Sequence, residues 1–213
     1  MSQIKPYDVV TYDQVNNTLM VSGLRLTAVY DPEPSAKTPK TVKAGGQSLG
    51  VLESAWDTIG DVKPGDSVSL LLTADGKVGG ILPATSQLRS TAIGTISGSS
   101  VSVFLPNGGT LELSGSVTGS VPDGQPVVVS ATKSGLSISR LPELRAPGEF
   151  KVNRMKLGDY TVSSGVRIYE QVSTGVTQTV SRSDLTMESI PADKIATYHL
   201  NSSNIVDYIV LKD

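Results

Sequence analysis

Apolar and polar residues alternate with a period of two along most of the chain, which is the pattern of half-buried β-strands. The alternating segments are short, and Val, Leu, Thr and Tyr dominate them. The predicted strands are residues 7–12, 18–22, 24–30, 67–73, 101–105, 110–113, 127–130, 136–140, 160–162, 166–170, 195–200 and 205–212. Turn sequences such as Asp75-Gly76 and Asn107-Gly108 lie between them and are typical of hairpins. The pattern therefore predicts an all-β protein.

Helical periodicity is clear in only one segment. Residues 52–59 (LESAWDTI) place four apolar side chains at the spacing of one helix face, and Gly60 follows as a helix end. We expect one short helix here, with Trp56 buried as the main filler of the surrounding core. A weaker signal for a single helical turn covers residues 182–190.

One sequence pattern occurs three times: a turn with proline, a strand, a polar turn and a returning strand. The three copies are residues 62–82, 121–141 and 190–211. Because an isolated hairpin is marginally stable in water, each copy must pack on earlier strands of its own module. Together with a Pro-rich linker at 141–148, the pattern predicts three modules. They are residues 1–87, 88–145 and 146–213. Their size favours small β-barrels or sandwiches of the SH3-like or OB-like type.

Composition narrows the class of protein further. Apolar residues make up 38%, charged residues 18% and aromatic residues 5% of the 213 positions. Low charge with many β-branched residues argues against a disordered chain, and no apolar run reaches the roughly 18 residues of a membrane span. The net charge of −2 argues against a nucleic-acid partner, which requires clustered Lys and Arg. We expect a globular β-rich chain with no nucleic-acid partner and no membrane insertion.

Residues that usually carry catalysis are sparse. Cysteine is absent and His199 is the single histidine, which excludes thiol catalysis and Cys-ligated zinc. Alternation places His199 opposite to Tyr198 and Leu200, so we expect a solvent-facing strand residue. The competing hypothesis makes it a general base near Ser202 or Asp207. A phosphate-binding glycine loop and a calcium-type carboxylate spacing are also missing. We therefore assign no catalytic, cofactor-binding or metal site, and expect neither a cofactor nor enzymatic activity.

A sugar-binding platform would need two or three exposed aromatic rings. Trp56, Tyr7, Tyr12 and Tyr30 all belong to the first predicted module. Tyr7 and Tyr12 are five residues apart, however, so they would face opposite sides of one strand. We expect the tyrosines to pack in the cores.

Several segments resemble a known kind of region. They are residues 7–13 (YDVVTYD), 17–22 (NTLMVS), 63–68 (KPGDSV), 70–78 (LLLTADGKV), 195–200 (IATYHL) and 205–213 (IVDYIVLKD). They are similar to the β-rich non-catalytic regions of secreted Firmicutes proteins that accompany S-layer homology domains. The resemblance implies an extracellular structural, spacer or interaction module of a cell-surface protein, and it carries over no functional residues.

The resemblance also implies partners, namely cell-wall polysaccharide or neighbouring surface-protein subunits. The N-terminal residues contain no apolar stretch of signal-peptide length, so we expect a fragment whose signal peptide and anchor lie elsewhere. Two alternatives remain. Phage tail and baseplate proteins also string together small Ser/Thr-rich β-barrels, and an adhesin or polysaccharide-binding module would have a similar composition.

Overall fold

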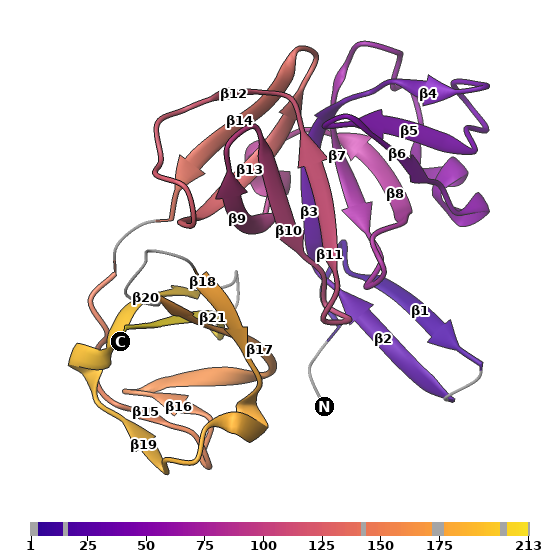
Figure 1. The fold of residues 1–213 in the computed structure, drawn as a ribbon. Helices are drawn as coiled ribbons and strands as arrows, with labels where there is room; N and C mark the ends of the chain where they lie inside the picture. The colour runs from indigo at the N-terminus through magenta and orange to yellow at the C-terminus, as the bar shows by residue number, and fades with distance from the viewer. Residues whose placement is uncertain (1–3, 15–16, 142–143, 172–176, 201–203, 213) are drawn as a thin grey trace. The chain divides into compact units, whose positions relative to one another are not determined.

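The computed structural model describes residues 4–14, 17–141, 144–171, 177–200 and 204–212, and it is built mainly of β-strands (Figure 1). Of these residues, 53% lie in strands and 8% in helices. The helices within the described ranges are all short 3-10 helices. The predicted all-β class is confirmed.

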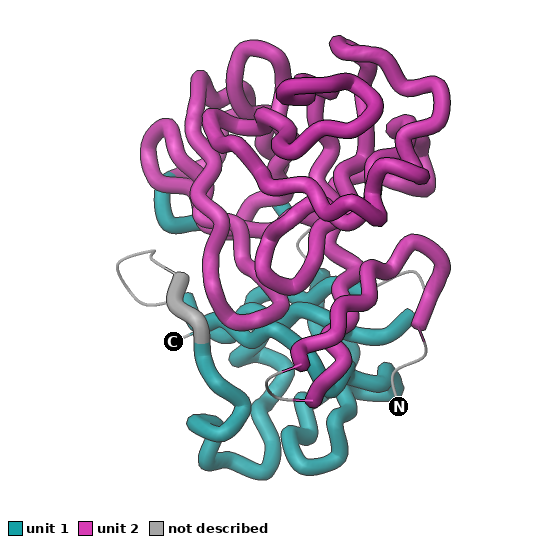
Figure 2. Tube along the Cα trace, turned by 90° about the vertical axis from the view of Figure 1, so that its right-hand side faces the viewer, with its two compact units in different colours: residues 1–2, 123–125, 141–213 teal, residues 3–122, 126–140 magenta. Residues whose placement is uncertain are grey.

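The chain forms two compact units, each with its own hydrophobic core (Figure 2). Unit 2 comprises residues 3–122 and 126–140, and the described part of unit 1 lies within 123–125 and 141–213. The division at residues 140–141 coincides with the start of the Pro-rich segment that the sequence predicts as a linker. The division predicted at residue 87, by contrast, lies inside unit 2.

The largest sheet of unit 2 has six strands in the order β11-β10-β9-β13-β14-β12. In that order the strands are Thr110–Ser114, Ser100–Phe104, Ile93–Ser97, Pro126–Thr132, Gly135–Arg140 and Ser116–Thr118. Neighbouring strands are antiparallel, except that β12 and β14 run parallel.

Three smaller antiparallel sheets complete unit 2. One is β3-β7-β8, formed by Leu24–Val29, Ser67–Leu72 and Val78–Pro83. The second is β4-β5-β6, formed by Pro32–Glu33, Thr41–Ala44 and Gln47–Gly50. The third is the hairpin of β1 (Val9–Asp13) and β2 (Thr18–Ser22). The sequence pattern does not predict β4–β6 or β9, because their residues lack a run of alternating large apolar side chains.

The core of unit 2 joins the first two predicted modules. It contains buried side chains from both, among them Leu26, Leu70, Val78, Val103, Leu113 and Leu136. The turn between β5 and β6 packs directly on the six-stranded sheet, because a Cβ on Gly45 would lie 2.9 Å from Leu136 Cδ2 and 3.0 Å from Leu113 Cβ. Gly45 also has a left-handed φ of 53°, which favours glycine at this contact. The Ser114 N–H donates a 2.7 Å hydrogen bond to the Gly45 carbonyl. The first two predicted modules therefore share one core.

Unit 1 contains a sheet in the order β19-β15-β16-β17-β21-β20, and β18 also pairs with β17. From β15 to β21 the strands are Phe150–Lys151, Lys156–Leu157, Tyr160–Gln171, Thr177–Val180, Ser189–Ile190, Ile195–Leu200 and Val206–Lys212. Strands β17 and β21 are parallel, and the other pairs are antiparallel. Phe150, Leu157 and Ile209 lie fully buried in the core of this unit.

Strand β17 differs from its prediction. It runs unbroken through Tyr160–Gln171, whereas the sequence predicts two separate strands, residues 160–162 and 166–170. Residues 163–165 instead interrupt the pairing with β21, where the register passes from Val162 directly to Arg167. Ser and Gly serve bulges as well as turns, so composition alone does not separate the two.

The predicted helix is present as a 3-10 helix, η1, over Glu53–Thr58. The other 3-10 turns are η2 (Ser86–Leu88), η3 (Arg182–Asp184) and η4 (Ala192–Lys194). Ala55 and Ile59 are buried, but Trp56 is only partly buried at the edge of the core. Its indole N–H donates a 2.9 Å hydrogen bond to the Pro39 carbonyl. The prediction that Trp56 is the main core residue is therefore wrong.

Candidate functional site

The hairpin of β1 and β2 projects from the other sheets of unit 2 (Figure 1). Its strands pair antiparallel, from Val9 with Ser22 at the base to Asp13 with Thr18 near the tip. Within the described residues, these two strands form a sheet by themselves. A two-stranded hairpin is marginally stable in water, so contacts made by its faces decide whether it holds its shape.

One face of the hairpin is apolar and exposed. The register places Val10 opposite Val21 and Tyr12 opposite Leu19, so the four side chains point to the same side. Their exposed fractions are 41% for Val10, 36% for Val21, 56% for Tyr12 and 66% for Leu19. We call these four residues the hairpin face. Exposed strands usually carry charged residues that prevent association, and the hairpin face carries none. Because contiguous exposed apolar surfaces often serve in contacts, the hairpin face is a candidate contact site.

The opposite face attaches the hairpin to unit 2. Val9 packs on β8, where a Cβ added to Gly79 would lie 2.6 Å from Val9 Cγ1. Ser22 is buried, and its hydroxyl oxygen accepts a 3.2 Å hydrogen bond from the Leu24 N–H. These contacts fix the base of the hairpin, and the hairpin face lies on the side away from them. The sequence predicts both strands but places their apolar side chains in a core.

Two tyrosines lie in the cores as predicted, Tyr30 in unit 2 and Tyr198 in unit 1. Tyr169 and Tyr208 are also buried but lie outside both clusters, with their rings 4.8 Å apart. Burial raises the pKa of the Tyr30, Tyr169 and Tyr208 phenols. Tyr7 and Tyr12 do not follow the prediction, because both rings are exposed.

His199 on β20 has a carboxylate partner, Asp207 on β21. His199 Nδ1 lies 2.7 Å from Asp207 Oδ1, and the two side chains are 33% and 39% exposed. The hydrogen bond to Asp207 raises the pKa of His199 above its ordinary value, while burial works in the opposite direction. His199 is therefore partly exposed to solvent, but the expectation of an ordinary strand histidine did not include its Asp207 partner.

A β-bulge explains why strand alternation fails here. His199 pairs with Tyr208 and Leu200 pairs with Val206, so Asp207 is an extra residue on β21. An extra residue changes the direction in which the neighbouring side chains point, and this places the Asp207 carboxylate next to the His199 ring. Ser202, the other partner in the competing hypothesis, lies outside the described residues.

The ion pair predicts a pH-dependent stability of unit 1. A raised pKa in the folded state means that the stabilisation is complete below the unfolded value of about 6.5 and is lost as the pH rises through the folded pKa. We expect unit 1 to be less stable at pH 8.5 than at pH 5.5, by at most about 1 kcal/mol for such an exposed pair. Calorimetry of wild type and His199→Gln at both pH values measures this. An equal pH response in the two proteins would contradict the assignment.

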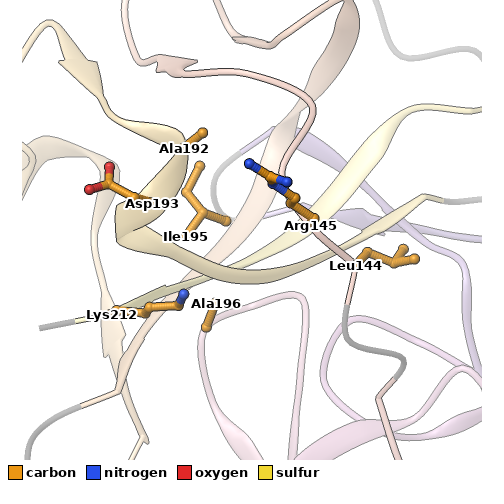
Figure 3. A pocket seen from close by; sticks show the side chains of 7 residues that line it. All are labelled: Leu144, Arg145, Ala192, Asp193, Ile195, Ala196 and Lys212. Carbon is orange, nitrogen blue, oxygen red and sulfur yellow. The ribbon is translucent and has the colours of Figure 1, made fainter.

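Unit 1 also contains an open groove with a volume of about 690 Å³. Leu144, Ala192 and Ala196 contribute partly exposed apolar side chains. Arg145 and Lys212 contribute positive charge, and Asp193 contributes a carboxylate. Figure 3 shows the Asp193 carboxylate turned away from the Arg145 guanidinium. Neither Arg145 nor Lys212 forms an ion pair within the described part of the chain. The groove therefore offers two cationic groups beside an apolar wall.

Two kinds of feature are not found among the described residues, namely a cluster of metal-ligand side chains and a membrane-spanning helix. Within the ranges that the structure covers, no three His, Asp or Glu side chains cluster in a way that could hold a metal ion. In the same ranges, no helix has both the length and the apolar character needed to span a bilayer.

Comparison with known proteins gives no relative. The chain matches no protein-family model, and no curated protein or solved structure matches it either. Functional information from the structure therefore comes from the hairpin, the His199–Asp207 pair and the groove.

Proposed function

We propose that this chain is a non-catalytic structural and interaction module of a bacterial cell-surface protein, with neighbouring protein subunits as its partners. The hairpin face carries the proposal, because an apolar surface without charge on a projecting hairpin suits protein–protein contact. The resemblance to secreted Firmicutes surface proteins supports the location, and two of its segments, residues 7–13 and 17–22, include the strands of this hairpin.

The groove of unit 1 favours a second candidate, binding of an anionic cell-wall polysaccharide. Arg145 and Lys212 would pair with its negative groups, and Leu144 and Ala196 would contact its apolar portions. This candidate uses a different surface from the first, so the two are separable by substitution.

Co-sedimentation with Gram-positive cell envelopes tests both candidates. We expect wild type to bind envelopes that keep their surface proteins, and Leu19→Asp to bind at least about tenfold less, because it would bury an unpaired charge. Met187→Asp is the matched control, because Met187 is 57% exposed on unit 1 and lies outside the hairpin.

Cell envelopes stripped of protein test the second candidate, because they retain the polysaccharide. Binding to these envelopes that is lost in the double variant Arg145→Ala, Lys212→Ala would support the second candidate in place of the first. Binding to neither preparation would overturn both.

A further inference from the structure

We propose that the hairpin face is the contact surface of a symmetric dimer, in which it packs on the same face of a second copy of this chain. The inference rests on the proposed function, and it names the neighbouring subunit as a copy of the chain itself. Four properties of the hairpin face support it: area, polarity, shape and attachment.

The area suits a reversible dimer. The exposed fractions of Val10, Tyr12, Leu19 and Val21 correspond to an exposed side-chain area on the order of 350 Å². Two copies packed face to face would remove about twice this area from water, which is roughly half of a standard specific interface. Exposed Ile4 and Tyr7, just before β1 in the chain, are available to extend the contact. An interface of this size places association in the weak, concentration-dependent range.

The polarity of the surface permits packing against itself. A twofold dimer brings identical patches together, so any charge in the patch would face a like charge or be buried. The hairpin face contains only aliphatic and aromatic side chains. Its single polar side-chain group, the Tyr12 hydroxyl, already donates a 2.6 Å hydrogen bond to Asn17 Oδ1. The patch can therefore be covered without leaving that hydroxyl unpaired.

The side chains also differ in size along the hairpin. The small residues Val10 and Val21 lie toward the base, and the large residues Tyr12 and Leu19 lie toward the tip. A twofold axis that sets the tip of one hairpin against the base of the other places Tyr12 on Val10 of the second copy and Leu19 on Val21 of the second copy. Large side chains then meet small ones across the interface, which is the condition for close packing.

The attachment of the hairpin keeps this surface available. Val9 on Gly79 holds the opposite face against β8, so the hairpin face cannot turn inward without breaking that contact. In a single copy the four side chains remain in water, and a second copy covers them.

Sedimentation velocity of the full chain tests the dimer. We expect the mass of wild type to rise from 22.3 kDa toward twice that value as concentration increases from about 1 to about 200 μM, the range expected for a weak dimer. Leu19→Asp should raise the dissociation constant at least about tenfold, since both copies carry the change. Met187→Asp should behave like wild type. Unchanged Trp56 fluorescence would show that unit 2 of Leu19→Asp is folded, and an unchanged far-UV circular dichroism spectrum would show that Met187→Asp is folded.

Val21→Phe distinguishes a specifically packed dimer from non-specific hydrophobic association. It enlarges the apolar surface, but in the tip-to-base arrangement it sets a large ring against Leu19 of the second copy. We expect weaker association, whereas non-specific contact would become stronger. A wild type that stays monomeric, equal loss in the Leu19 and Met187 variants, or stronger association of Val21→Phe would overturn the proposal. A monomer that still binds intact envelopes would overturn the dimer alone and leave the proposed function standing.

Discussion

Leu136→Ala is expected to lower the free energy of unfolding of unit 2 by about 2–5 kcal/mol, and Leu26→Ala is expected to act on the same transition by a similar amount. Both side chains are fully buried in one hydrophobic cluster. Alanine leaves a cavity that a close-packed core fills only in part. The sequence places the two residues in different modules, so a common transition is the consequence of their shared core.

Urea unfolding followed by tryptophan fluorescence measures this effect. Trp56 is the only tryptophan of the chain and lies in unit 2, so its emission reports on that unit. Ser139→Ala is the control on the same strand as Leu136, because Ser139 is exposed and such changes usually shift stability by less than about 0.5 kcal/mol. If Leu136→Ala left the Trp56 transition in place and produced an earlier one visible only by circular dichroism, residues 88–145 would fold separately.

The hairpins that the sequence pattern predicts are present in the structure. The residues that determine such a hairpin lie close together in the sequence. Strands β7 and β8 occupy Ser67–Leu72 and Val78–Pro83, close to the predicted ranges. Alternation and an Asp-Gly turn determine these features within about fifteen residues. The apolar face of each hairpin, however, packs against segments that are distant in the sequence. The contact of Gly45 with Leu113 and Leu136 joins segments about 70 to 90 residues apart. The periodicity of apolar residues does not predict such a contact.

The candidate sites were missed for the same reason. Val10, Tyr12, Leu19 and Val21 alternate like core residues, and only the arrangement of the sheets shows that nothing in the described residues covers them. Strict alternation would leave His199 without a partner. The extra residue in β21 shifts that alternation by one position, and a bulge has no consistent sequence signal.

Gly94→Ala is expected to destabilise unit 2 by about 3 kcal/mol or more, although it adds a single methyl group. Gly94 lies on β9, next to β10 in the six-stranded sheet. A Cβ there would lie 2.4 Å from the Ser102 carbonyl oxygen and 2.8 Å from Val103 Cα. Both are backbone atoms of the paired strand, so no side-chain rotation relieves the overlap. The strands must separate, and the hydrogen bonds of the central sheet weaken with them.

Gly50→Ala is the matched control. Gly50 also lies in a strand, β6, but a Cβ there would meet no atom within 4 Å. Both substitutions reduce the conformational freedom of the unfolded chain by a similar amount, so the difference between them isolates the close approach of β9 to β10. We expect Gly50→Ala to change stability by no more than about 1 kcal/mol in the urea titration followed by Trp56 fluorescence. Equal effects of the two substitutions would mean that β9 and β10 are farther apart at this point than the structure places them.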